Sequence, residues 1–407
     1  EIPSGILTHS TLWTTVAEQC ILPIQARSGV SDMKLAQRMS RLGTETAFEV
    51  LAKARRLEAE GMNVIHLEIG EPDFESPENV VSAGSSAIVD GYTHYGSSSG
   101  FPELRDRIAE EISSTRGIAV TGENVVVTPG GKPIMFFAIL ALVDQGDEVL
   151  YPNPGFPIYE SMIEFVGGVP VPMQLHESSA FNVDIDEIEA RITDRTKLMI
   201  VNSPNNPCGS VIPKEDLQRL ANLAKEHDIA VLSDEIYNRF LYEGEHHSIA
   251  AFPGMRDRTI ILDGLSKSYA MTGWRIGYGV MPQELVEPIS RLATNSVSCT
   301  ASFTQIAALE ALSGPQERSY SMVEEFKKRR DIIVAGLNDI PGIRCPLPLG
   351  AFYVFPSIEE TEITSQVFAE SLLSEAGVAS LAGESFGRFG NGYIRFSFAN
   401  SVENLEI

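Results

Sequence analysis

The chain has 407 residues, of which 43% are hydrophobic and 21% are charged, with 33 glycines and 23 prolines. This composition is typical of a globular protein and excludes a collagen-like, coiled-coil or largely disordered chain. Its 31 lysines and arginines against 55 aspartates and glutamates give a net charge of −24, which argues against nucleic acids and anionic membranes as partners. A few local cations can nevertheless still bind a small anionic ligand.

The first residues give no structural pattern, and we interpret residues 1–30 as an N-terminal arm. They lack the regions of a signal peptide, and the apolar run from Cys20 to Ile24 is too short to cross a membrane. The four cysteines are Cys20, Cys208, Cys299 and Cys345. Their wide separation, without metal-binding spacing, favours reduced thiols and a cytoplasmic protein.

The middle of the chain alternates between short apolar runs and helical segments. A helix is predicted over Thr44–Gly61, where apolar residues recur at helical spacing. Four buried strands follow, at Val125–Val127, Leu198–Val201, Ile229–Leu232 and Ile260–Leu262. Helices after the first two are predicted to run through Leu142 and over Pro213–His227. This alternation indicates an α/β fold with a mostly parallel sheet covered by helices on both faces.

The C-terminal part has a different pattern. A long charged helix is predicted over Glu317–Leu337, followed by strands over Ala351–Phe355 and Tyr393–Phe398. Ser401 can cap a helix that is only beginning where the sequence stops, and we expect the native chain to continue past Ile407. We therefore predict a large domain over residues 76–316 and a smaller α+β domain built from residues 31–75 and 317–407.

Polar residues follow the predicted strands at the edge where an open parallel sheet binds its ligands. They are Gly130, Gly131 and Lys132, then Asn206, then Asp234 with Tyr237, then Ser266 with Lys267. A Gly-Gly turn before a helix offers backbone N–H groups to an anion such as phosphate. Pro133 after Lys132 excludes a P-loop, and no dinucleotide fingerprint is present. A lysine near a phosphate cradle, with a carboxylate one strand away, fits a Schiff-base cofactor.

Several ordered segments carry a family resemblance. Residues 266–277 (SKSYAMTGWRIG) are similar to the lysine signature of class I/II aminotransferases, fold type I enzymes that use pyridoxal 5'-phosphate (PLP). Other segments resemble further blocks of that family in its own order: residues 70–74 (GEPDF), 203–209 (SPNNPCG), 233–237 (SDEIY), 350–353 (GAFY) and 395–397 (RFS). The resemblance covers roughly residues 35–407 and is closest to the bacterial aspartate/prephenate branch. It implies a large PLP-binding domain with a mostly parallel seven-stranded sheet and a smaller α+β domain.

The resemblance implies a role for each residue of the cofactor site. Lys267 would form the internal aldimine with PLP and then transfer the proton during the reaction. Asp234 would pair with the pyridine nitrogen, and Asn206 and Tyr237 would hydrogen-bond the phenolic oxygen. Further cofactor-binding residues would be Gly130, Gly131, Ser266 and Arg275 around the phosphate, Lys132 after the glycine turn, Phe156 stacked on the ring, and Tyr95, which reaches the phosphate from the neighbouring subunit of a homodimer.

Substrate binding is implied for a smaller set. Arg395 would grip the α-carboxylate in a bidentate fork, with help from Asn206 and from the backbone at Gly70. Lys132 matches the lysine that binds an acidic side chain, although a lysine at a helix start can equally point to water. Residues 43–46 (GTET) would line the same pocket and carry a carboxylate, Glu45.

Ordinary structural roles remain open for individual residues: a helix N-cap for Asp234, a surface ion pair for Arg275 and a core position for Phe156. No metal site is expected, and the adjacent histidines His246 and His247 are expected to face solvent.

We predict a PLP-dependent, homodimeric aminotransferase that moves an amino group between an L-amino acid and a 2-oxo acid by a ping-pong mechanism, with acidic or aromatic substrates favoured. One alternative is a fold type I PLP enzyme that performs elimination, cyclisation, decarboxylation or oxidation, because the same motifs hold the cofactor for all of these reactions. A more remote alternative is a regulator with a retired PLP domain, which the net charge and the lack of a DNA-binding module disfavour.

Overall fold

The computed structural model describes residues 33–407, and the interpretation of residues 1–30 as an arm lies outside the described residues. The chain divides into two units, Glu1–Met39 and Ser40–Ile407. Of the first unit, the described part includes the start of a 3-10 helix, Gln37–Arg41. Everything below concerns the second unit.

The second unit is organised around a large sheet with strand order β2-β9-β8-β7-β6-β3-β4-β5. The strands are β2 (Val125–Thr128), β3 (Glu148–Asn153), β4 (Val169–His176), β5 (Asn182–Val183), β6 (Thr196–Asn202), β7 (Ala230–Asp234), β8 (Thr259–Gly264) and β9 (Gly277–Val280). Strand β9 is antiparallel to both its neighbours, and β5 is antiparallel to β4. The remaining pairs are parallel, so the predicted mostly parallel sheet is confirmed, with the two-residue β5 as an eighth strand at the edge.

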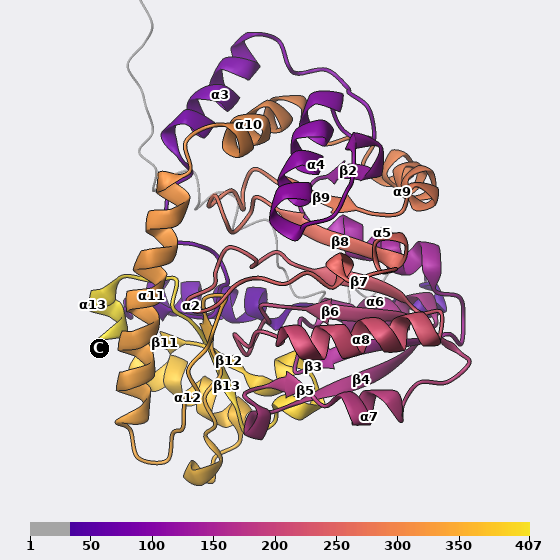
Figure 1. Ribbon diagram of the computed structural model, residues 1–407. Coiled ribbons are helices and arrows are strands. Elements are labelled where there is room, and N and C mark those ends of the chain that lie inside the picture. Colours follow the sequence, from indigo (N-terminus) through magenta and orange to yellow (C-terminus); the bar gives the residue numbers. More distant parts are fainter. Residues whose placement is uncertain (1–32) are drawn as a thin grey trace, which may run out of the picture. The chain divides into compact units, whose positions relative to one another are not determined.

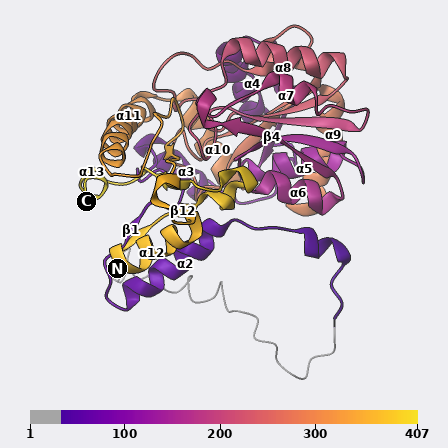
Figure 2. The same cartoon turned by 90° about the horizontal axis from the view of Figure 1, so that it is seen from below.

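Helices cover both faces of this sheet, as Figure 2 shows. One face packs on α5 (Lys132–Leu142), α6 (Ile158–Val166) and α9 (Gln283–Ser296). The opposite face packs on α4 (Pro102–Arg116), α7 (Ile185–Glu189), α8 (Lys214–Glu226) and α10 (Ser302–Ser313), with α3 (Glu78–Val89) against α10. Because both faces are covered, nearly every residue of the central strands is buried, which explains their continuous apolar runs.

Two small sheets and the last helices lie beside the large sheet (Figure 1). Strands β10 (Tyr353–Val354), β13 (Ile394–Ser397) and β12 (Leu381–Ala382) form an antiparallel sheet, and β1 (Ile65–His66) pairs with β11 (Val378–Ala379). The helices here are α2 (Thr46–Ala59), α11 (Glu317–Asn338), α12 (Ser365–Ala376) and α13 (Val402–Leu405). Their aromatic core, around Phe326 and Phe352, also contains Tyr237, which lies three residues after the end of β7. That shared core fixes the small sheets against the strand ends.

Most predicted elements occur within two or three residues of their expected bounds. The strand expected over Ala351–Phe355 is shorter, because Ala351 adopts a positive φ of 55° that is incompatible with strand pairing. The Ser401 side chain caps α13 by accepting the Asn404 N–H. No helix in residues 33–407 is long and apolar enough to cross a membrane.

Candidate active site

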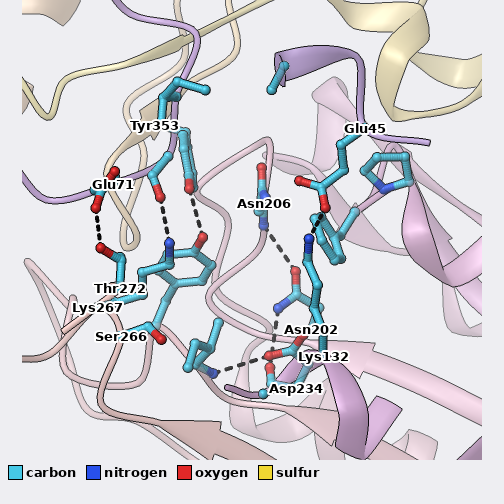
Figure 3. A pocket seen from close by; sticks show the side chains of 18 of the residues that line it. Glu45, Glu71, Lys132, Asn202, Asn206, Asp234, Ser266, Lys267, Thr272 and Tyr353 are labelled. Carbon is cyan, nitrogen blue, oxygen red and sulfur yellow. Dashed lines mark hydrogen bonds and ion pairs between the residues drawn. The ribbon is translucent and has the colours of Figure 1, made fainter. Parts of the chain in front are cut away.

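A large cavity lies at the carboxyl ends of the central strands. Its volume is about 550 Å³. Figure 3 shows that its polar side chains come from several elements and point toward one another. Of the sequence-predicted residues, those lining the cavity are Gly70, Gly131, Lys132, Phe156, Asn206, Asp234, Tyr237, Ser266, Lys267, Arg275 and Arg395. Polar groups from separate strand ends therefore converge, as parallel-sheet topology predicts.

Lys267 enters the cavity three residues after β8 ends. Its Nζ donates a hydrogen bond to the carbonyl of Gly70 at 2.5 Å. Burial lowers the pKa of this amine from 10.5 to about 8, and the nearby positive charge of Arg395 also lowers it, against the raising effect of Glu71. A substantial fraction of the amine is therefore neutral, and able to act as a nucleophile or base, at mildly alkaline pH.

Asp234 is the last residue of β7 and is buried beneath the cavity. Its carboxylate accepts hydrogen bonds from the Tyr159 hydroxyl at 2.6 Å and from the Ile236 N–H at 3.2 Å. Burial nevertheless raises the pKa of the carboxyl to about 6. A cationic group placed against Asp234 would lower that pKa and relieve the cost of its burial.

Tyr159 was missed by the sequence analysis. It is fully buried near the start of α6, three residues after Phe156. The two rings meet edge-on, with their centres 5.6 Å apart. The only signal was this i, i+3 spacing, which does not distinguish a positioning hydroxyl from a core tyrosine. Asn202 was also missed, although it is the polar residue that ends β6. It donates to the carbonyl of Asp234 at 3.2 Å and accepts the N–H of Asn206 at 3.0 Å.

Arg395 lies on β13 and reaches the cavity from the small antiparallel sheet. It is buried, and its guanidinium donates to Asn206 Oδ1 at 3.2 Å and to the carbonyl of Glu68. Its Nε has no hydrogen-bond partner, and no described carboxylate forms an ion pair with it. Burial lowers the pKa of Arg395, which marks the cost of leaving this charge unpaired.

Two hydroxyls and a glycine complete the centre of the cavity. Tyr237 and Tyr353 share a hydrogen bond between their hydroxyl oxygens at 2.7 Å. Gly70 faces Tyr353 so closely that a Cβ at this position would lie 2.0 Å from that hydroxyl. Only glycine therefore lets the backbone carbonyl of residue 70 approach Lys267 at this point.

The glycine turn before α5 forms a compact cradle with Arg275. Gly130 has a φ of +87°, and a Cβ there would lie 2.4 Å from Arg275 Nη2. Arg275 itself has a φ of 56° and donates to the carbonyl of Thr272 at 2.9 Å. Ser266 and Gly131 line the cavity beside it. The start of α5 and this guanidinium together offer an anion several donors.

Lys132 and Glu45 form an ion pair inside the cavity (Figure 3). Lys132 is the first residue of α5, and its Nζ also lies 5.4 Å from the centre of the Phe156 ring. The prediction that Glu45 lines the same pocket as Lys132 is confirmed.

Some predicted residues have a different outcome. Gly130 does not line the cavity, and its N–H donates to the carbonyl of Thr128 at 2.8 Å instead of pointing to a ligand. Tyr95 does not line the cavity, and its side chain is 89% exposed on the segment after α3. The expectation that both His246 and His247 face solvent is wrong for His246. This residue is largely buried, because its Nε2 lies 3.0 Å from the buried carboxylate of Glu235. Within residues 33–407 no cluster of histidine, cysteine or carboxylate side chains is arranged to hold a metal ion.

The donor set fits PLP. The cavity offers a lysine with a lowered pKa, a buried carboxylate, paired phenol hydroxyls, and a glycine and arginine cradle for a phosphate. A Cβ at Gly277 would lie 2.4 Å from the N–H of Gly131, so the cradle depends on glycine there too. The unpaired guanidinium of Arg395 adds a place for a carboxylate.

Comparison with known proteins gives consistent matches. The family model "Aminotransferase class I and II" matches residues 62–407. "Aromatic-amino-acid aminotransferase 2" of Thermococcus litoralis is 39% identical, over 84% of this chain and 89% of its own length. A protein of Aquifex aeolicus named "Probable aspartate/prephenate aminotransferase" is 39% identical, over 91% of this chain and 95% of its own. The solved aspartate aminotransferase of Thermus thermophilus with maleate superposes with a TM-score of 0.87 at 40% identity, over 91% and 97% of the two chains.

Proposed function

The chain belongs to the class I and II aminotransferase family and is a PLP-dependent enzyme acting on amino and 2-oxo acids, and from this premise we propose that the cavity at the strand ends is its active site. The observation that carries the proposal is the set of three ionisable side chains that converge there without forming an ion pair with any described residue. Lys267, Asp234 and Arg395 are each buried at a cost that shows in their shifted pKa values. Such clusters are typical of sites whose counter-charges arrive with the ligand.

PLP, when bound, supplies an electron-accepting ring that stabilises negative charge at the substrate α-carbon. Asp234, held by Tyr159 and by the Ile236 N–H, keeps a negative charge where the ring nitrogen would lie. Lys267 Nζ binds the cofactor and then moves the proton at the α-carbon, which the neutral form of the amine can accept.

Arg395 binds the α-carboxylate of the substrate. A guanidinium suits this task because its fork of N–H groups matches both carboxylate oxygens. Asn206, already bonded to Nη1 of this arginine at 3.2 Å, keeps the fork oriented. Gly70 lets the backbone lie against the Tyr353 hydroxyl, where a Cβ would be only 2.0 Å away.

The phosphate is held by the backbone N–H of Gly131, by Ser266 and by Arg275, whereas Gly130 shapes the turn and its own N–H donates to the carbonyl of Thr128 at 2.8 Å. We assign Tyr95 to the phosphate of the neighbouring subunit, since its exposed side chain is then accounted for by a homodimer with shared active sites. The scattered cysteines keep the cytoplasm as our proposed compartment.

Acidic and aromatic amino acids are the proposed substrate classes. Lys132 provides a cation for an acidic side chain, and the Phe156 ring beside it provides an apolar surface for an aromatic one. The names of the relatives from Aquifex aeolicus and Thermococcus litoralis support these two classes.

The test is a half-reaction with a single amino acid. The purified, PLP-loaded enzyme is expected to convert L-aspartate or L-phenylalanine into its 2-oxo acid, one equivalent per subunit, with no 2-oxo acid acceptor present. Catalytic release of ammonia or carbon dioxide, or consumption of oxygen, would instead support an elimination, decarboxylation or oxidation. Lys267→Ala is the control, and it is expected to lose the reaction because no other amine occupies its position.

A further inference from the structure

The ion pair between Lys132 and Glu45 is a charged feature of the cavity that the reaction chemistry above does not use. The two residues come from separate elements, since Lys132 begins α5 and Glu45 directly precedes α2. Their side chains meet inside the cavity (Figure 3), where that of Glu45 is 18% exposed and that of Lys132 is 48% exposed. The cation that would bind an acidic side chain is therefore already paired with a carboxylate of the protein.

The surroundings place this pair close to the reacting groups. The charges of both residues act on the pKa of Lys267. Glu45 raises that pKa, and Lys132 lowers it. Glu45 also acts on the pKa of Arg395. The Phe156 ring lies 5.4 Å from Lys132 Nζ, so a neutral aromatic side chain placed here meets an aromatic surface and a neutralised cation.

On the basis of the proposed function, we propose that Glu45 is a specificity-determining residue, an internal carboxylate that substrates with an acidic side chain must displace from Lys132. A neutral or aromatic side chain leaves the pair intact. An acidic one brings a second carboxylate to the same ammonium group, and two carboxylates repel one another there unless one of them leaves. Glu45 therefore weakens the binding of dicarboxylic substrates relative to aromatic ones.

The structure gives the displaced carboxylate a position to occupy. Glu45 is the N-cap residue of α2, yet its side chain makes no capping hydrogen bond there. The first N–H groups of α2 lie at the positive end of the helix dipole, and they can donate hydrogen bonds to a carboxylate there. Rotation of Glu45 toward them would release Lys132 without leaving the carboxylate uncompensated. The same enzyme can in this way accept both substrate classes.

The test measures binding of two unreactive ligands to the PLP-loaded enzyme by calorimetry. Succinate carries two carboxylates, and 3-phenylpropanoate carries one carboxylate and a phenyl ring. In Glu45→Gln the affinity for succinate relative to 3-phenylpropanoate is expected to rise about fivefold, the upper range for a partly exposed ion pair. Lys132→Gln is expected to lower that ratio, and the double variant is expected to show no gain over Lys132→Gln alone.

Glu49→Gln is the matched control, because it removes the same charge from the same helix outside the cavity. The inference is overturned if Glu45→Gln shifts the ratio no more than Glu49→Gln does, or if the gain persists in the double variant. Glu45→Ala, which removes the side chain entirely, must shift the ratio in the same direction as Glu45→Gln. Failure of the proposed function is distinguishable, since it appears as absence of 2-oxo acid product from the unaltered enzyme.

Discussion

At the scale of single residues, the candidate site is defined by charges that the protein buries without full compensation. Burial lowers the pKa of Lys267 to about 8 and raises that of Asp234 to about 6, so both shifts have the same cause and disfavour the charged form. Arg395 shows the same effect, with an Nε that has no hydrogen-bond partner. A cationic ring nitrogen beside Asp234 would offset the cost of burying that carboxylate, and a ligand carboxylate beside Arg395 would offset the cost of burying the guanidinium.

The pKa of Lys267 gives a prediction for the apoenzyme. Only the neutral amine reacts with the PLP aldehyde, so the rate of cofactor capture is expected to increase with pH and level off above about pH 8. An exposed lysine would level off only above its usual pKa of 10.5. Stopped-flow absorbance of the apoenzyme mixed with PLP measures this profile.

Two variants test the cause of that profile in opposite directions. Lys132→Gln removes a neighbouring positive charge and should move the midpoint to higher pH. Glu45→Gln removes a negative charge and should move it to lower pH, since these charges act on Lys267 with opposite signs. A midpoint near 10.5 in the unaltered apoenzyme would contradict the assignment.

At the scale of elements, a buried ion network holds the strand ends that carry the site. Arg116, the last residue of α4, contacts Glu235 at 2.9 Å and Asp263 at 2.8 Å. Glu235 directly follows Asp234 at the end of β7, and Asp263 lies near the end of β8, four residues before Lys267. Against the effect of burial, His246 and then the Arg116 guanidinium hold the pKa of Glu235 well below its usual range. One arginine therefore joins a helix to both strands that present the reactive side chains.

Arg116→Met is expected to lower the free energy of unfolding by about 3 to 5 kcal/mol, because it leaves two buried carboxylates without their cation. Urea denaturation measures this loss. The control is Arg291→Met, whose partner Glu287 lies on the same helix with both side chains mostly exposed, and which should cost less than about 0.5 kcal/mol. Equal effects of the two substitutions would show that the buried network does not stabilise the strand ends.

At the scale of the whole molecule, α3 and the segment after it carry several exposed apolar side chains. The exposed apolar side chains of α3 and the segment after it are Val81, Ile88, Val89, Tyr92 and Tyr95. A run of exposed apolar residues of this kind is typical of an interaction surface. It agrees with the proposed homodimer, in which Tyr95 of one subunit serves the phosphate site of the other.

Dimers of two different variant subunits test whether Tyr95 acts on the phosphate site of the neighbouring subunit. Tyr95→Phe removes one hydrogen bond to a charged group and should weaken PLP binding by roughly tenfold. If Tyr95 acts across the interface, a dimer of one Lys267→Ala subunit and one Tyr95→Phe subunit contains one unaltered site, with normal PLP affinity. Co-expression with two affinity tags isolates this dimer. Weak PLP binding at every reactive site of the mixed dimer would show that Tyr95 acts within its own subunit, and normal PLP binding by the Tyr95→Phe homodimer would show that it does not act on the phosphate.

The fold class, and which residues lie at the strand ends, could be predicted from the amino-acid sequence alone. Apolar runs such as Val125–Val127 and Ile260–Leu262 can be recognised in the sequence. They are apolar throughout because the central strands of the sheet are buried on both faces. The topology of a parallel sheet then brings the residues after those strands to one edge. Asp234, Asn206 and Lys267 are therefore predicted from sequence to lie close together, and all three line the cavity.

Only the tertiary structure decided which groups touch. The contacts that build the site join residues far apart in the sequence. Tyr159 and Asp234 are 75 positions apart, Glu45 and Lys132 are 87 apart, and Arg116 and Asp263 are 147 apart. No local periodicity records such contacts, because they depend on how helices pack against strand ends. The buried position of His246 has the same origin, since its partner Glu235 lies on a strand end rather than in its own loop. Secondary structure follows from neighbours in sequence, whereas the pairing of buried charges follows from neighbours in space.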